Sequence, residues 1–105
     1  MEKIYRIDFY VPEEQAEKVK EAMFNAGAGK IGNYDCCCWQ TFGDGQFRAL
    51  EGSEPFIGEK NKIEKVDELK IEMVCEEKIL DAVISALKEA HPYEMPSYQI
   101  IEAFV

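Results

Sequence analysis

The chain has 105 residues, 47% of them apolar, so it is long enough for one domain with one core and too apolar for a disordered segment. Its 21 Asp and Glu residues outnumber 12 Lys and Arg residues, and the net charge of −9 disfavours nucleic acid and anionic membranes as partners. No apolar run reaches the length of a membrane span, and the N-terminus is unlike a secretory signal. We therefore expect a cytoplasmic protein whose four cysteines are free thiols.

The first third of the sequence predicts a strand followed by a helix. Residues 3–11 alternate polar and apolar side chains, which is the period of a strand that buries one face. Pro12 suits a first helical turn, and apolar residues then recur at helical spacing, so we predict a helix over 12–26. The glycine-rich stretch 27–33 follows a helix and lacks the ending of a P-loop, which indicates a connector and not a phosphate site.

The middle of the chain predicts two strands and an insert. Residues 34–42 predict a strand with two partly apolar faces, Gly43-Asp44-Gly45 predicts a turn, and 46–50 predict a returning strand. We expect 43–65 to form an insert hairpin and loop within a single domain that spans 1–105. The insert also carries four apolar side chains that need burial against the domain or a partner: Phe47, Leu50, Phe56 and Ile57.

The last third predicts strand, helix and strand. Residues 66–75 alternate like a strand, 76–90 carry an apolar stripe at helical spacing, His91-Pro92 ends that helix, and 97–104 predict a final strand. The order β-α-β-β-β-α-β predicts an α+β, ferredoxin-like two-layer sandwich with both helices on one sheet face. The other face needs a cover, so we expect the insert to fold over it, subunits to pair through it, or both.

Three motifs together resemble one known family. They are GAGxIGxY at 27–34, the stretch around FR-x-LEGSEPFIG within 43–58, and HPYE at 91–94. The chain resembles the YqfO-type insert domain of the NGG-one-interacting-factor-three-like family, which is similar to PII signalling proteins and CutA. This resemblance implies a PII/CutA-like fold and a homo-oligomer, either a dimer or a trimer. The metal ligands of the larger family members lie in flanking lobes without counterpart in these residues, so neither those ligands nor a GTP cyclohydrolase activity is carried over.

His91 is the only histidine, and it has two open interpretations. With Glu94, and with Glu51 or Glu54, it could hold a divalent metal. A structural role is favoured, in which His91 caps the preceding helix while Tyr93 docks on the sheet.

The run Cys36, Cys37, Cys38 is unusual. In a strand only Cys36 and Cys38 would share a side, and the run lacks zinc-finger spacing, so a small buried apolar role is favoured for each thiol. Binding of a soft metal such as copper(I) stays open. A hydrolase would need a cysteine activated by His91, and no flanking signature supports that arrangement.

Arg48 could bind an anionic small molecule, although an internal ion pair with Glu51 or Glu54 is the favoured interpretation. The residues expected to line one binding surface are Arg48, Glu51, Phe56, His91, Tyr93 and Glu94. The sequence therefore predicts a non-enzymatic, self-associating module that binds a small ligand or has a regulatory role. Metal binding through His91 with Glu94 or through the cysteine run, and a hydrolase-type enzyme, are the alternatives.

Overall fold

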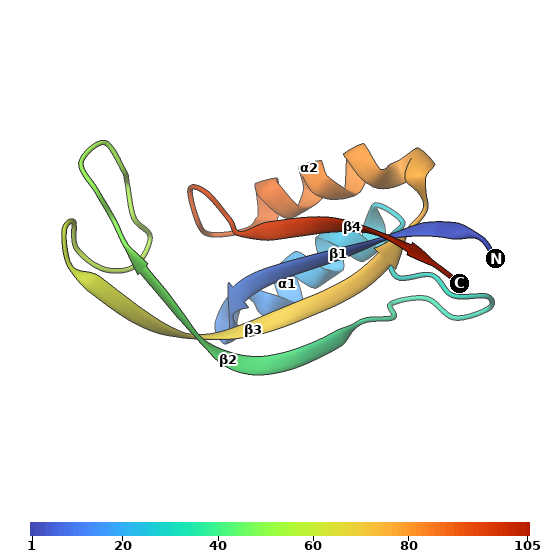
Figure 1. Cartoon of the computed structure of the whole chain (residues 1–105), viewed down its shortest axis with the longest axis horizontal. Coiled ribbons are helices and arrows are strands. Elements are labelled where there is room, and N and C mark those ends of the chain that lie inside the picture. The colour runs from blue at the N-terminus through green and yellow to red at the C-terminus, as the bar shows by residue number, and fades with distance from the viewer.

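The computed structural model describes all 105 residues. The chain folds into two layers, a four-stranded antiparallel sheet and two helices that lie on one of its faces (Figure 1). The elements are β1 Lys3–Pro12, α1 Glu13–Asn25, β2 Trp39–Arg48, β3 Ile63–Cys75, α2 Leu80–Ala90 and β4 Tyr98–Phe104, with a short 3-10 turn at Glu77–Ile79. The strand order is β2-β3-β1-β4, which is the ferredoxin-like arrangement. The predicted fold class is confirmed. No helix has the length and apolar character needed to cross a membrane.

The core lies between the sheet and the helices because alternate strand residues and one stripe of each helix face each other. Side chains in this layer are almost completely shielded from solvent: Ile7, Phe9 and Val11 of β1, Leu69, Ile71 and Met73 of β3, Ala16, Val19 and Met23 of α1, and Val83 and Leu87 of α2. Burying a large apolar side chain of this kind contributes about 1.5–3 kcal/mol. The periodicities read from the sequence therefore correspond to the observed core.

The predicted hairpin within residues 34–50 is wrong. Residues 34–38 form no extended strand, and β2 runs straight through Gly43-Asp44-Gly45, antiparallel to β3 along its whole length. The glycines do not turn the chain, since neither has a positive φ. Gly45 instead leaves room for a neighbour, because a Cβ there would overlap the carboxylate of Glu68 on β3. The sheet consequently has one strand fewer than predicted.

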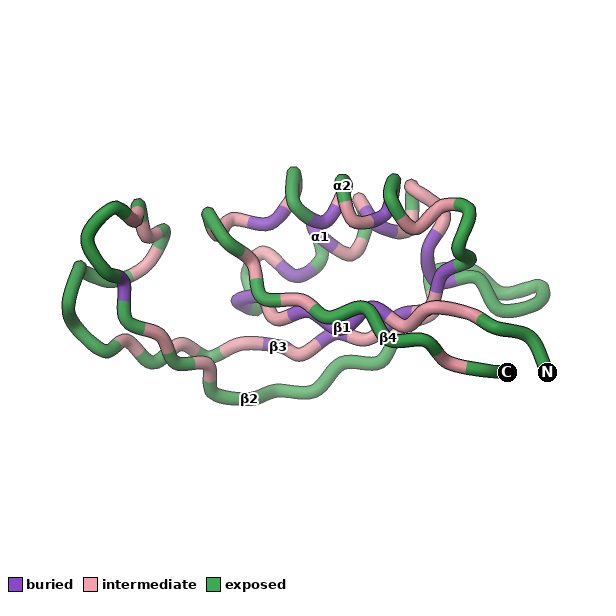
Figure 2. The backbone as a smooth tube through the Cα atoms, turned by 45° about the horizontal axis from the view of Figure 1, so that its top comes forward, coloured by how far each residue is buried: buried purple, intermediate pink, exposed green.

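The second face of the sheet has no helix over it (Figures 1 and 2). At its centre Asp8 is only 3% exposed, because Arg6 donates two hydrogen bonds of 2.9 and 3.0 Å to its carboxylate. Strand alternation also places the exposed side chains of Trp39 and Ile101 on this open face. The expectation that the insert covers it is wrong, since residues 49–62 lie beyond the end of the sheet (Figure 1).

The two ends of the chain lie side by side (Figure 1). Glu2 and Val105 exchange two backbone hydrogen bonds of 2.9 Å, which extend the ladder between β1 and β4. Adjacent ends are the geometry that allows a domain to sit within a longer chain without altering its fold.

Candidate ligand-binding site

The strands β2 and β3 continue beyond the rest of the sheet as a two-stranded ribbon. β1 pairs with β3 only as far as Pro12 opposite Glu68, whereas β2 follows β3 to Arg48 opposite Ile63. We call residues 44–48 and 63–67 the arm, and residues 49–62 the arm loop. A backbone hydrogen bond of 2.6 Å from the Asn61 N–H to the Ala49 carbonyl closes the base of this loop.

The arm and its loop turn back onto residues 91–97, which connect α2 to β4 (Figure 1). Tyr93 is the centre of this contact, since its hydroxyl donates a 2.8 Å hydrogen bond to Oε2 of Glu68. Its ring centroid lies 6.4 Å from that of Phe47 and 6.3 Å from that of Phe56. The backbone N–H of Glu54 donates to Glu94 at 3.0 Å. These contacts join segments that are far apart in the sequence.

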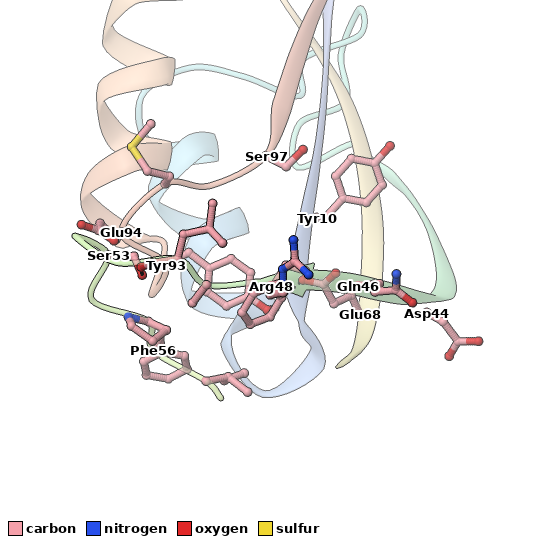
Figure 3. Close-up of a pocket in the computed structure, with 17 residues that line it drawn as sticks. Tyr10, Asp44, Gln46, Arg48, Ser53, Phe56, Glu68, Tyr93, Glu94 and Ser97 are labelled. Atoms are coloured by element: carbon pink, nitrogen blue, oxygen red, sulfur yellow. Dashed lines mark hydrogen bonds between the residues drawn. The ribbon is translucent and has the colours of Figure 1, made fainter. Parts of the chain in front are cut away.

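A hollow of about 610 Å³ lies between the arm, the arm loop and residues 91–97 (Figure 3). This volume is in the range of small-molecule sites. Eight of its 17 lining residues are apolar, so a ligand there would be partly desolvated. The charged side chains of the lining are Asp44, Arg48, Glu68 and Glu94.

The structure brings four of the six predicted site residues together around this hollow: Arg48, Phe56, Tyr93 and Glu94. The other two lie outside it. Glu51 is exposed on the arm loop, where its carboxylate accepts a 3.4 Å hydrogen bond from Nδ2 of Asn61. His91 is buried behind Tyr93, with the two ring centroids 4.9 Å apart.

Both ring nitrogens of His91 have protein partners. Nε2 lies 2.7 Å from the carbonyl oxygen of Tyr10, and Nδ1 accepts a 3.1 Å hydrogen bond from the backbone N–H of Tyr93. This pattern assigns a neutral ring with its proton on Nε2. Burial lowers the pKa of His91, although the Tyr10 carbonyl and the Glu68 carboxylate act in the opposite direction. Only the backbone N–H of His91 reaches a helix carbonyl, that of Leu87, while the ring bonds the Tyr10 carbonyl of β1. His91 thus has an interior role, but its side chain does not cap α2 as predicted.

No group of three or more His, Cys, Asp or Glu side chains is arranged to hold a metal ion. A metal at His91 and Glu94 would require the ring to give up Tyr10 or Tyr93, and it would compete with the Glu54 N–H for the Glu94 carboxylate. The geometry therefore favours the interior role of His91 over coordination.

The cysteine run lies outside the sheet, so the predicted placement of Cys36 and Cys38 on one strand face is wrong. Cys36 is exposed with a φ of 55°, whereas Cys75 is buried, as expected for a small apolar side chain. Desolvation, followed by the Asp35 carboxylate, raises the pKa of the Cys36 thiol, and burial raises the pKa of Cys75. A raised pKa leaves less thiolate and opposes a nucleophilic role.

Arg48 makes no ion pair, so the predicted internal pair with Glu51 or Glu54 is wrong. The physical reason is that the arm loop directs the Glu51 carboxylate to Asn61. Arg48 is consequently the single cationic side chain of the hollow.

Among the lining residues that the sequence did not assign to the site are Tyr10 of β1 and Glu68 of β3. Each occupies a polar position in an alternating strand, which predicts a solvated side chain. The only local signal is the glycine at 45, which permits a neighbouring strand's side chain to approach. Recognising Glu68 as that neighbour requires the register between β2 and β3.

No family model matches the chain. It is 41% identical over 99 residues to a GTP cyclohydrolase 1 type 2 homolog of Halalkalibacterium halodurans, covering 94% of this chain and 27% of the relative. It is 43% identical over 95 residues to the Bacillus subtilis protein of the same name, covering 90% and 26%. The chain thus spans about a quarter of the length of the curated relatives it matches.

Solved structures of a NIF3-related protein and of CutA are similar to this chain. A Bacillus cereus protein related to NIF3 matches with a TM-score of 0.83 and 34% identity, over 97% of this chain and 26% of that protein. CutA from Xylella fastidiosa matches with a TM-score of 0.70 and 21% identity, over 97% and 85% of the two chains, which shows the fold alone. The resemblance drawn from the three motifs is confirmed: the chain is similar to a segment of the NIF3-related proteins and has the fold of CutA.

Proposed function

We propose, from the similarity of this chain to a segment of the NIF3-related proteins, that it is a small non-enzymatic binding or regulatory module. Its proposed ligand site is the hollow between the arm, the arm loop and residues 91–97. The observation that carries this proposal is that the arm and its loop contact Tyr93 and Glu94 around that hollow, through the rings of Phe47 and Phe56 and the backbone N–H of Glu54. These contacts hold segments that are distant in the sequence around one space, which is the arrangement expected of a preformed binding site.

Two features support binding over catalysis. The thiols of Cys36 and Cys75 have raised pKa values, and both nitrogens of His91 are engaged. A mechanism that uses His91 as the base for one of these two thiols would need both groups to be available. Metal binding at His91 and Glu94 is the alternative, and it predicts that zinc added to the protein displaces the Tyr93 amide from the ring.

Native mass spectrometry of protein purified without chelator tests the ligand site. We expect bound small-molecule mass that is lost in the double variant Phe47→Ala, Phe56→Ala, because both rings line the hollow. Phe104→Ala is the matched control, since Phe104 is 60% exposed on β4 and lies outside the hollow. Retention of the mass by the double variant would contradict this location of the site.

Self-association through the open face is the second part of the proposal. The face carries Trp39, 70% exposed on the edge strand β2, and Ile101, 38% exposed on the opposite edge strand β4. Exposed apolar side chains on an uncovered sheet are typical of an interface. We expect a dimer or trimer in which a second copy covers this face.

The single tryptophan reports directly on that face. We expect Ile101→Glu to convert the oligomer to monomer in sedimentation and to shift the Trp39 emission to longer wavelength. Phe42→Glu is the control, because Phe42 is 69% exposed on β2 but lies on the opposite face of the sheet. A wild-type monomer at all concentrations would refute the self-association.

A further inference from the structure

We propose that the hollow takes an organic ammonium cation, held by the faces of three aromatic rings and by two carboxylates. The inference rests on the proposed function of the hollow as a ligand site and names the class of molecule that enters it. The ligand class is a methylated or quaternary ammonium group on a small organic body.

Three aromatic rings form the apolar part of the site. The rings of Phe47 and Phe56 each lie near that of Tyr93, with centroids 6.4 and 6.3 Å away, and are tilted from its plane by 51° and 50°. All three rings line the hollow, and they come from β2, the arm loop and the connection after α2. Because the face of an aromatic ring is electronegative, several rings tilted around one space attract a cation and exclude water from it.

The Tyr93 ring is held in place for this role. Its hydroxyl donates to Glu68 at 2.8 Å, and its backbone N–H donates to Nδ1 of His91 at 3.1 Å. A ring that is already fixed loses little conformational entropy when a ligand binds.

Two carboxylates of the hollow have hydrogen-bond donors but no positive partner. Glu68 accepts from the Tyr93 hydroxyl, and Glu94 accepts from the Glu54 N–H at 3.0 Å. Neither takes part in any of the ion pairs of the chain. Glu68 is partly buried and Glu94 is exposed, and both carboxylates line the hollow beside apolar rings with no cationic partner, so a cation bound there would be attracted to them.

The charge balance around the hollow points the same way. Asp44, Glu68 and Glu94 against Arg48 leave a net charge of −2 on the lining. The whole chain carries −9, which attracts cations over longer distances.

The side chains of the hollow favour an organic ammonium over a metal ion. A bare metal ion needs several ligands around one point, and no group of three or more metal-ligating side chains is so arranged. An organic ammonium needs only ring faces and nearby negative charge. Arg48, the one cationic side chain of the lining, would attract a hydroxyl or anionic end of the same molecule, while the ammonium end lies against the aromatic rings.

Four probes of nearly equal shape separate charge from size. They are choline, its neutral isostere tert-butylethanol, the zwitterion glycine betaine, and the tert-butylacetate anion. Each is titrated into the full chain while the proton signals of the Phe47, Phe56 and Tyr93 rings are followed by NMR. We expect choline to bind about tenfold more tightly than tert-butylethanol, and tert-butylacetate to bind most weakly.

Each other result overturns the inference in a distinct way. Equal binding of choline and tert-butylethanol would show an apolar site without cation preference. Tightest binding of tert-butylacetate would show an anion site at Arg48, and the proposed function would survive with a different ligand class. If no probe moves the three rings, the ammonium class is excluded, and bound mass in the native spectrum separately decides whether the hollow is a site at all.

Matched variants complete the test. Phe56→Leu keeps an apolar side chain but removes a ring face, so choline should weaken about fivefold while tert-butylethanol is unchanged. Glu94→Gln, which still accepts the Glu54 N–H, should weaken choline about threefold. Asp67→Asn removes the same charge from the arm outside the hollow and should leave choline binding as it was. Equal losses in Glu94→Gln and Asp67→Asn would indicate a general charge effect and overturn the site.

Discussion

The body of the domain and its arm are stabilised in different ways. The body, formed by the helices and the paired parts of β1, β3 and β4, contains a cluster of 13 buried apolar residues. In the arm and arm loop only Ala49 is buried. The body therefore depends on apolar burial, which has no direction, and the arm and its loop depend on a few specific contacts with Tyr93 and Glu94. We therefore expect that the candidate site can be altered with little effect on the stability of the fold.

We expect the largest loss of stability for truncation of a phenylalanine in the body, and a much smaller loss for one in the arm loop. Phe9 is 0% exposed in the body, so Phe9→Ala should lower the free energy of unfolding by about 3–5 kcal/mol. Phe56 is 54% exposed in the arm loop, so Phe56→Ala should lower it by less than about 1 kcal/mol. Urea unfolding measures both values, and equal losses would show that the arm belongs to the same cooperative unit as the core.

A smaller effect should follow from loss of the Tyr93 hydroxyl. Tyr93→Phe removes the hydrogen bond to Glu68 of the body that fixes the ring against which Phe47 and Phe56 pack, and should thereby destabilise the docked arm by about 1.5 kcal/mol. Hydrogen exchange should quicken at the Glu54 amide, which donates to Glu94, and stay unchanged in β1. Tyr34→Phe is the control, since Tyr34 is 76% exposed and its hydroxyl makes no hydrogen bond. Faster exchange throughout the body would refute a local role for the contact.

The two glycines of β2 offer a finer comparison. A Cβ at Gly45 would overlap the Glu68 carboxylate, whereas a Cβ at Gly43 would meet no atom within 4 Å. Gly45→Ala should therefore displace Glu68 and weaken its bond to Tyr93 by about 1 kcal/mol, while Gly43→Ala should not. Exchange at the Glu54 amide distinguishes them, and identical behaviour would contradict the role assigned to Gly45.

The smallest expected effect is a pH dependence at the boundary between body and arm. Burial holds the pKa of His91 below its usual 6.5, so the unfolded chain binds a proton that the folded chain resists. The free energy of unfolding is therefore unaffected by His91 above about pH 6.5, and it decreases as the pH falls from there toward the lower pKa of the folded state. Thermal unfolding at about pH 7.5 and about pH 5 should show a greater loss for the wild type than for His91→Gln. A parallel loss in the two proteins would assign the change to carboxylates.

Most of the body was predictable because its patterns are local. The alternation of Ile7, Phe9 and Val11 follows from one buried strand face, and the stripe of α2 follows from one buried helix face. The arm was not predictable in the same way. Gly43 and Gly45 carry the signal of a turn, but pairing with β3 overrides it and extends both strands.

The candidate site was likewise predictable only in part. Arg48, Phe56, Tyr93 and Glu94 were expected at one surface, and they do line one hollow. His91 has the residue type of a ligand, but its burial and its two hydrogen bonds place it in the interior. The expected ion pair of Arg48 failed because nearness in sequence does not set the direction of a side chain in a loop.

The two-layer class, the core faces and the segments that contribute to the site could all be predicted, since they depend on periodicity and residue type within short windows. The three-dimensional structure was needed to show that β2 and β3 form an arm, that the arm packs on Tyr93, and that Arg48 makes no ion pair. These features join residues that are far apart along the chain, as Glu54 and Glu94 are. Such contacts are set by strand register and sheet twist, which no local pattern records.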